Sequence, residues 1–137
     1  MRAVAVVAVS PADDDHVFLA RVFDRSEWEF RQARTCAEAL ELLKGTEVPV
    51  VLCSAQLPDG SWRDLLARLA GQPVPPRLIV ATRLADESLW AEVLDRGGYD
   101  LLAMPFDPEE VLRVASLAWR QWQRESERLA RSASAAG

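Results

Sequence analysis

Residues 48–60 have the sequence VPVVLCSAQLPDG, in which an apolar run leads into a turn. The run from Val48 to Cys53 carries no charge and is rich in valine, which is typical of a strand covered on both faces of a sheet. Leu57-Pro58-Asp59-Gly60 has the residue types of a turn, and Ser61-Trp62-Arg63-Asp64 then caps a short helix. This part of the chain therefore predicts a buried strand, a turn and a helix.

The same alternation of strand and helix extends in both directions along the chain. We expect the other strands at 3–9, 27–32, 78–81 and 99–103, and helices at about 11–25, 35–44, 61–70, 86–96 and 107–130. Strands that alternate with helices at this spacing form βαβ units, whose parallel sheet is covered on both faces. The sequence therefore predicts an α/β protein with one three-layer α/β/α domain, five helices and a five-stranded parallel sheet of order 2-1-3-4-5.

The start of the first helix is marked by Ser10 and Pro11. We expect Ser10 to cap this helix and Pro11 to occupy its first position. The three acids at 13–15 then fall in its first turn, where each stabilises the helix dipole by about 0.3–1 kcal/mol. Alternatively, two of these acids form a pair that binds a metal, one helical turn after the end of the first strand. We expect His16, which follows them, at the solvated surface.

The length and charge of the chain limit what it can be. Its 137 residues suit one domain, which we expect at 1–122, followed at 123–137 by a helical extension and a disordered tail. The net charge of −5 argues against nucleic-acid binding, which needs a basic surface. No apolar run approaches the ~20 residues that span a bilayer, so we expect a cytoplasmic protein without membrane contact. Neither Cys36 nor Cys53 has metal-ligand spacing, and we expect free thiols.

Ligands of open parallel sheets bind beyond the carboxyl ends of the strands. The residues that follow the central strands are Ser10, Pro11, Ser54, Ala55, Gln56, Thr82, Arg83, Met104 and Pro105. This set is poor in carboxylates, lacks lysine and has no glycine-rich phosphate-binding motif. The sequence thus offers neither a nucleotide site nor a nucleophile–base pair, and it argues against an enzyme.

Four stretches, 33–43, 50–60, 78–86 and 97–106, resemble the response-regulator receiver domain of two-component (phosphorelay) signal transduction. They occur in the family's order and spacing, and the resemblance extends from about Arg2 to Arg120. It implies a receiver fold and a place in signalling. It also implies a site with a phosphoacceptor aspartate after the third strand and an acid pair after the first, which helps to hold Mg²⁺. A threonine or serine follows the fourth strand, and a lysine follows the fifth.

Carried over to this chain, the family pattern fails at most positions. They are occupied by Ser54 for the phosphoacceptor, Ser10 and Pro11 for the acid pair, Thr82 for the hydroxyl and Met104 for the lysine. Leu101 stands at the aromatic switch position, and we expect the bond before Pro105 to be cis, as it usually is in the family. Because an acyl phosphate needs a carboxylate and Mg²⁺ prefers oxygen ligands, we expect that phosphorylation is lost and that no metal or other cofactor binds.

Three residues of this region have a second interpretation. Ser54 could form a phosphate ester, but a hydroxyl needs a base and a metal to react, and neither is evident. Cys53 could sense oxidants, but it has no basic neighbour in sequence, and we expect a small buried side chain. Met104 could contact an apolar ligand, although we expect it to fill the space of the missing lysine stem.

The family commonly pairs through its fourth helix, last strand and last helix. On this chain that region carries Trp90, Leu94, Leu117 and Trp119, which we predict as an interaction face because tryptophan often anchors interfaces. Packing of these side chains within the domain is the alternative.

The end of the last helix carries Arg120, Arg124 and Arg128 at a spacing of four residues. We expect a solvated face that suits the C-terminal helix dipole. A short coiled coil or a docking segment is the alternative.

Together these features predict an atypical receiver, a signalling protein that binds a protein partner without phosphorylation. With no output domain in the sequence, we expect it to act on a separate chain or as a dimer. A sensor of a small ligand or anion that uses Ser10, Ser54, Thr82 and Arg83 is the alternative. A flavodoxin-like electron carrier is a third possibility, against which the turn at 57–60 argues.

Overall fold

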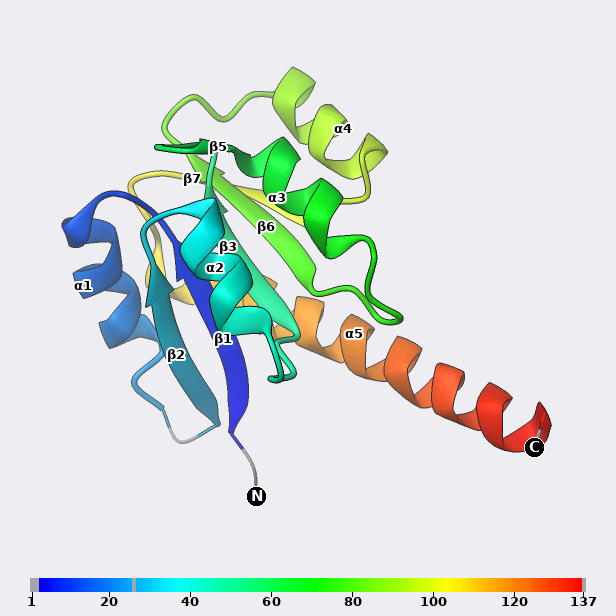
Figure 1. The fold of residues 1–137 in the computed structure, drawn as a ribbon. Helices are drawn as coiled ribbons and strands as arrows, with labels where there is room; N and C mark the ends of the chain where they lie inside the picture. Colours follow the sequence, from blue (N-terminus) through cyan, green and yellow to red (C-terminus); the bar gives the residue numbers. More distant parts are fainter. Residues whose placement is uncertain (1–2, 26, 137) are drawn as a thin grey trace.

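The computed structural model describes residues 3–25 and 27–136 and contains a five-stranded parallel sheet of order β2-β1-β3-β6-β7 (Figure 1). Its strands are β1 (Val4–Val9), β2 (Trp28–Ala33), β3 (Val50–Ser54), β6 (Arg77–Thr82) and β7 (Asp100–Ala103). Two short strands, β4 (Gln56–Leu57) and β5 (Gly60–Ser61), pair separately as a hairpin. The predicted order 2-1-3-4-5 is confirmed, since β6 and β7 are the fourth and fifth strands of the sheet.

Five helices cover the two faces of this sheet, as predicted. They are α1 (Asp13–Val22), α2 (Cys36–Leu43), α3 (Trp62–Leu69), α4 (Glu87–Asp95) and α5 (Pro108–Ala136). Helices α2, α3 and α4 pack their apolar side chains on one face, and α1 and α5 pack on the other. This arrangement buries β3 on both sides, and its residues 50–53 are at most 2% exposed.

Side-chain caps begin four of these helices, and at α5 the carboxylate of Asp107 accepts from the backbone of Glu109. Thr35 accepts from the backbone of Glu38 at α2, Ser61 forms a capping box with Asp64 at α3, and Asp86 accepts from Leu89 at α4.

The predicted start of the first helix is wrong. Helix α1 begins at Asp13, and its N-cap residue Ala12 makes no side-chain cap. The backbone N–H of Ser10 donates to the carbonyl of Ala33 at 2.9 Å, so Ser10 continues the ladder between β1 and β2. Because Ser10 is still held by the sheet, the helix starts two residues beyond the predicted position of Pro11.

Helix α5 is longer than predicted, and the predicted disorder of the tail is wrong for residues 132–136. The helix continues to Ala136, because alanine, serine and arginine all tolerate helix and neither glycine nor proline interrupts them. Trp122 is the last buried side chain of α5, and the end of the helix projects from the sheet (Figure 1). Residues 1, 2 and 26 of the predicted domain, and Gly137, lie outside the described residues. No helix in the described part of the chain is long and apolar enough to cross a membrane.

The turn after α4 depends on two glycines. Gly97 has a φ of +97°, and a Cβ added to Gly98 would lie 2.6 Å from Cγ1 and 2.9 Å from the carbonyl oxygen of Val93. Val93 is fully buried, so it has no room to move away.

We therefore expect Gly98→Ala to lower the free energy of unfolding by about 1–3 kcal/mol, the usual range for overpacking. Urea denaturation measures this change. Gly71→Ala is the matched control, because no atom lies within 4 Å of its added Cβ. Equal stability of the two variants would contradict this account of the turn.

Candidate functional site

The carboxyl ends of β1, β3, β6 and β7 meet at one edge of the sheet. Val9 pairs with Cys53, so the next residues of these two strands, Ser10 and Ser54, lie side by side. Thr82 and Met104 follow on β6 and after β7. The structure therefore brings Ser10, Ser54 and Met104 to one crevice, whereas Pro11 and Thr82 do not line it.

The crevice between these strand ends is almost closed. The cavity that remains measures about 10 Å³, roughly the space of one water molecule. Met104, which is half-buried, lines this cavity with Phe106, Leu19, Ser10 and Asp15, among others. Phe106 also stacks on Phe18 of α1 with ring centroids 5.8 Å apart, which closes the crevice on its α1 side.

Ser10 is the centre of a polar network under the β1–α1 loop. It is 4% exposed, and its hydroxyl donates to Asp15 at 2.7 Å and accepts from the backbone of Ala12 at 3.1 Å. Its carbonyl accepts from Nε2 of His16 at 2.8 Å. The expected surface position of His16 is wrong, because this residue shares the buried helix stripe of Leu19 and is only 3% exposed. The Nδ1 atom of His16 has no hydrogen-bond partner in the described part of the chain.

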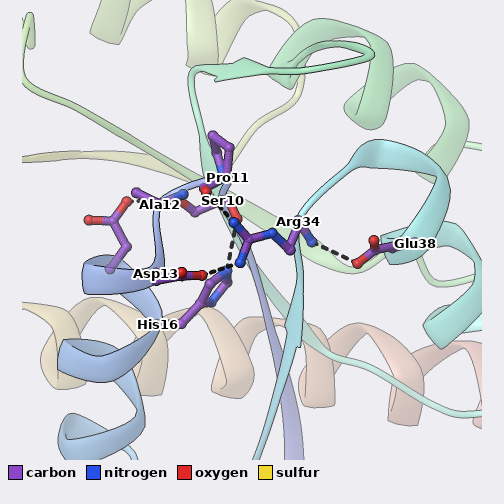
Figure 2. A network of polar contacts seen from close by, with 8 residues as sticks. Ser10, Pro11, Ala12, Asp13, His16, Arg34 and Glu38 are labelled. Atoms are coloured by element: carbon purple, nitrogen blue, oxygen red, sulfur yellow. Dashed lines mark hydrogen bonds and ion pairs between the residues drawn. The ribbon is translucent and has the colours of Figure 1, made fainter.

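Arg34 is a residue of this region that the sequence reasoning missed. Its guanidinium forms an ion pair with Asp13 and donates to the carbonyl of Pro11 at 2.9 Å, as Figure 2 shows. Its backbone N–H donates to Glu38 at 3.0 Å, so Arg34 joins the β1–α1 loop to α2. A signal was present, because Arg34 directly follows β2, the edge strand whose carboxyl end lies beside that of β1.

The other strand-end residues are held by local hydrogen bonds. The hydroxyl of Thr82 accepts from the backbone of Leu84 at 3.1 Å, and the carbonyl of Ser54 accepts from the thiol of Cys53 at 3.1 Å. Cys53 is fully buried, as expected, and burial raises the pKa of its thiol well above the usual range. The peptide bond between Met104 and Pro105 is cis.

These donors do not fit the Mg²⁺ that the family implies. Magnesium prefers an octahedral set of oxygen ligands that includes carboxylates. Of the acids at 13–15, only Asp15 lines the crevice, and it is occupied by Ser10, while Asp13 is paired with Arg34. Within the ranges that the structure describes, no three potential metal-ligating side chains of the acid, histidine or cysteine type lie together.

Three of the four residues of the predicted interaction face are exposed, and the fourth is not. Trp90, Leu94 and Leu117 are 48%, 39% and 41% exposed, and the indole N–H of Trp90 donates to Asp100 at 3.1 Å. Trp119 does not belong to this face, because its ring packs edge-on against Trp28 of β2, with centroids 6.0 Å apart. This contact places Trp119 on the side of α5 that covers the sheet.

Leu101, at the switch position, is half-buried and packs into the core under α2, α3 and α4. Beside it, Glu92 of α4 binds Arg63 of α3 at 2.6 Å and Arg96 at 2.7 Å. The hydrogen bond from Arg63 is the main reason why the pKa of Glu92 falls to about 2. The face around α4 is thus fixed to α3 by an ion-pair network.

Asp59 fixes the hairpin that follows Ser54. Its carboxylate accepts from the backbone N–H groups of Cys36 at 2.9 Å and Ala37 at 3.1 Å, at the start of α2. These hydrogen bonds, first that of Cys36, lower the pKa of Asp59. The sequence identified Asp59 as a turn residue but did not show this contact with α2.

Comparison with known proteins shows which family of domains this chain matches. The family model described as "Response regulator receiver domain" matches residues 9–116. A search of curated proteins finds no match.

Solved structures of receivers are similar to this chain along nearly their whole length. The signal receiver domain of an HD domain-containing protein from Pseudomonas fluorescens is 28% identical with a TM-score of 0.84, covering 93% of this chain and 95% of that chain. A CheY-like receiver domain protein from Methanospirillum hungatei is 18% identical with a TM-score of 0.79, covering 90% and 99%. A chemotaxis response regulator of Vibrio cholerae is 17% identical with a TM-score of 0.77, covering 85% and 99%. The last two show likeness of fold alone.

We expect Arg34→Ala to loosen the β1–α1 loop, because it removes the ion pair with Asp13 and the hydrogen bond to Pro11. Hydrogen–deuterium exchange followed by mass spectrometry should show faster exchange at 10–16. Arg31→Ala is the control, since Arg31 pairs only with Glu29 of its own strand in the described structure. Unchanged exchange in the Arg34 variant would show that this residue does not hold the loop.

The Asp59 contact predicts a pH dependence of stability. A carboxyl whose folded pKa is depressed stabilises the fold above its unfolded pKa of about 3.9, and this contribution is lost as the pH falls through the folded pKa. We expect Asp59→Ala to melt at a lower temperature than the parent protein at pH 7, with the difference shrinking below about pH 4. Thermal denaturation between pH 2 and 8 tests this, with the exposed Asp24→Ala as control. A difference that is constant with pH would rule out the charge effect.

Proposed function

The chain belongs to the response regulator receiver domain family, and from this premise we propose that it is an atypical receiver that binds a protein partner without being phosphorylated. It is a receiver domain of the two-component response-regulator type. The proposal concerns what this domain does when the usual chemistry of its strand ends is missing.

The closed crevice is the observation that carries the proposal. Receiver phosphorylation makes an acyl phosphate on a carboxylate, and Ser54 offers a hydroxyl at that position. A phosphoryl group and its metal need far more room than a cavity of about 10 Å³. Met104 contributes no positive charge where the family has lysine, and it lines the space that would have to open.

Two carboxylates beside the β1–α1 loop that could bind a metal are already engaged by other side chains. The carboxylates of Asp13 and Asp15 are occupied by Arg34 and Ser10. These internal contacts hold the loop in one arrangement, and Leu101 at the switch position lies partly in the core. We therefore propose that the domain presents a constant surface to its partner and catalyses no reaction.

The exposed side chains of α4 and α5 supply that surface. Trp90, Leu94 and Leu117 are large apolar residues exposed to solvent, and a tryptophan with a fixed indole is a good interface anchor. The partner is another signalling protein or a second copy of this chain, bound through α4, β7 and α5. A role in sensing an anion or metabolite at the crevice is less well supported, because the hydroxyls of Ser10 and Thr82 are engaged and the cavity is small.

Two further parts of the proposal concern organisation and location. We assign the receiver-like domain to residues up to 122 and a helical extension to those beyond, since Trp122 is the last buried side chain of α5. We also propose a cytoplasmic location, for which the two free and buried cysteines suit a reducing compartment.

Intact-protein mass spectrometry after incubation with acetyl phosphate and Mg²⁺ tests the loss of phosphorylation. We expect no added phosphoryl group on this chain, whereas an ordinary receiver treated in parallel gains one. The variant Ser54→Asp, Met104→Lys asks whether restoring two groups is enough. A labile phosphoryl group on the unaltered protein would overturn the proposal and direct attention to the acids at 13–15 or to Asp59.

A further inference from the structure

One face of α5 carries a continuous stripe of arginine. Its members recur at spacings of three or four residues, which places them on the same face of the helix. They are Arg113, Leu117, Arg120, Arg124, Arg128 and Arg131. All six side chains are exposed. From first to last the stripe is about 27 Å long at the usual helical rise.

The arginines of this stripe have no acidic partner among the residues that the structure describes. Elsewhere, six basic side chains form ion pairs, namely those of Arg31, Arg34, Lys44, Arg63, Arg77 and Arg96. None of the five stripe arginines forms one with any residue that the structure describes. Of the two glutamates in this part of α5, Glu125 is paired with Arg77 of β6, and Glu127 forms no ion pair with a residue that the structure describes.

The part of α5 that carries the stripe is positively charged, whereas the whole chain is negatively charged. Residues 113–131 contain five arginines and two glutamates, whereas the chain as a whole has a net charge of −5. A groove of about 540 Å³ runs along the same part of α5. Its lining has more arginine than glutamate and consists of Arg77, Gln121, Arg124, Glu125, Glu127, Arg128 and Arg131. A concave and positively charged surface has therefore formed on an acidic protein.

We propose that this arginine stripe is the docking surface for an acidic helix of a partner protein. The inference deepens the proposed role as an interaction module by naming the chemistry of the partner, and it does not depend on the loss of phosphorylation. Arginine and carboxylate groups form strong, directional pairs, and a partner helix of about five turns matches the length of the stripe. Leu117 lies within the stripe and supplies an apolar contact at its N-terminal part.

Other occupants of this surface fit less well. A symmetric pair of chains that joined through the stripe would oppose arginine to arginine, which is unfavourable. Nucleic acid or an anionic membrane presents a charged surface far larger than the stripe, so the net charge of −5 opposes its approach more than that of one short acidic helix. Exposed Leu117 within the stripe supplies an apolar side chain of the kind that is typical of protein interfaces.

Binding of synthetic peptides, followed by fluorescence anisotropy, tests the inference. The probe is a labelled helical peptide of about 20 residues with glutamate along one face, and its counterpart has glutamine at the same positions. We expect the glutamate peptide to bind about tenfold more tightly than the glutamine peptide, and salt to weaken its binding.

The variant Arg120→Gln, Arg124→Gln, Arg128→Gln should lose this preference. Its matched control is Arg21→Gln, Arg68→Gln, Arg83→Gln, which removes the same charge from exposed arginines outside α5. Thermal melting should show that both variants stay folded, because all six side chains are on the surface.

Each other outcome overturns the inference. Equal binding of the two peptides, or an equal loss in the control variant, would show that the stripe does not select acidic helices. Oligothymidylate or phosphatidylserine vesicles that bind through the same arginines as tightly as the glutamate peptide would assign the surface to nucleic acid or lipid. Dimers that dissociate in the stripe variant during sedimentation would assign it to a second copy. Phosphorylation by acetyl phosphate would overturn the proposed function but leave these results as they are.

Discussion

The complete burial of β3 between β1 and β6 is the constraint on which the rest of the structure depends. Residues 50–53 are covered on both faces, and every change of register would move valine and leucine side chains out of closely packed layers. The fixed register places Ser10 beside Ser54 and aligns Ser54 with Ala81 of β6. The core therefore determines which side chains share the strand-end crevice, whether or not those side chains carry out phosphoryl transfer.

The strand-end crevice at this edge of the sheet is held by contacts within the domain. Arg34 supplies positive charge to Asp13, and the hydroxyl of Ser10 satisfies Asp15. Met104 and Phe106 fill the space with apolar atoms, so no buried charge is left without a partner there. The strand ends of this chain are therefore ordered by contacts within the domain, which is the arrangement from which we propose a receiver that needs neither metal nor phosphoryl group.

The sequence predicted the parts of this structure that depend on long apolar runs and local caps. The sheet order followed from valine-rich strands, and the caps at Thr35, Ser61 and Asp86 follow from local hydrogen bonding. The errors at Ser10 and Trp119 share a cause, because each depends on a contact across the fold: Ala33 for Ser10 and Trp28 for Trp119. The roles of Arg34 and Asp59 were missed for the same reason, since each joins elements that are distant in sequence. The error at His16 is local, since its ring binds the carbonyl of Ser10 and shares the buried face of Leu19.

Helix α5 shows how one element can serve both the core and the surface. Val111, Ala115 and Ala118 are buried against the sheet, and Arg77 holds the helix at Glu125 and Gln121, beyond the last of these contacts. This clamp keeps the far part of the helix in a fixed direction, although its later residues contribute little to the core. A rigid helix loses less conformational entropy on binding than a flexible tail would, so its exposed stripe is already arranged for a partner. If the receiver acts without phosphorylation, as we propose, specificity for its partner has to come from such a preformed surface, because no switch between two conformations would supply it.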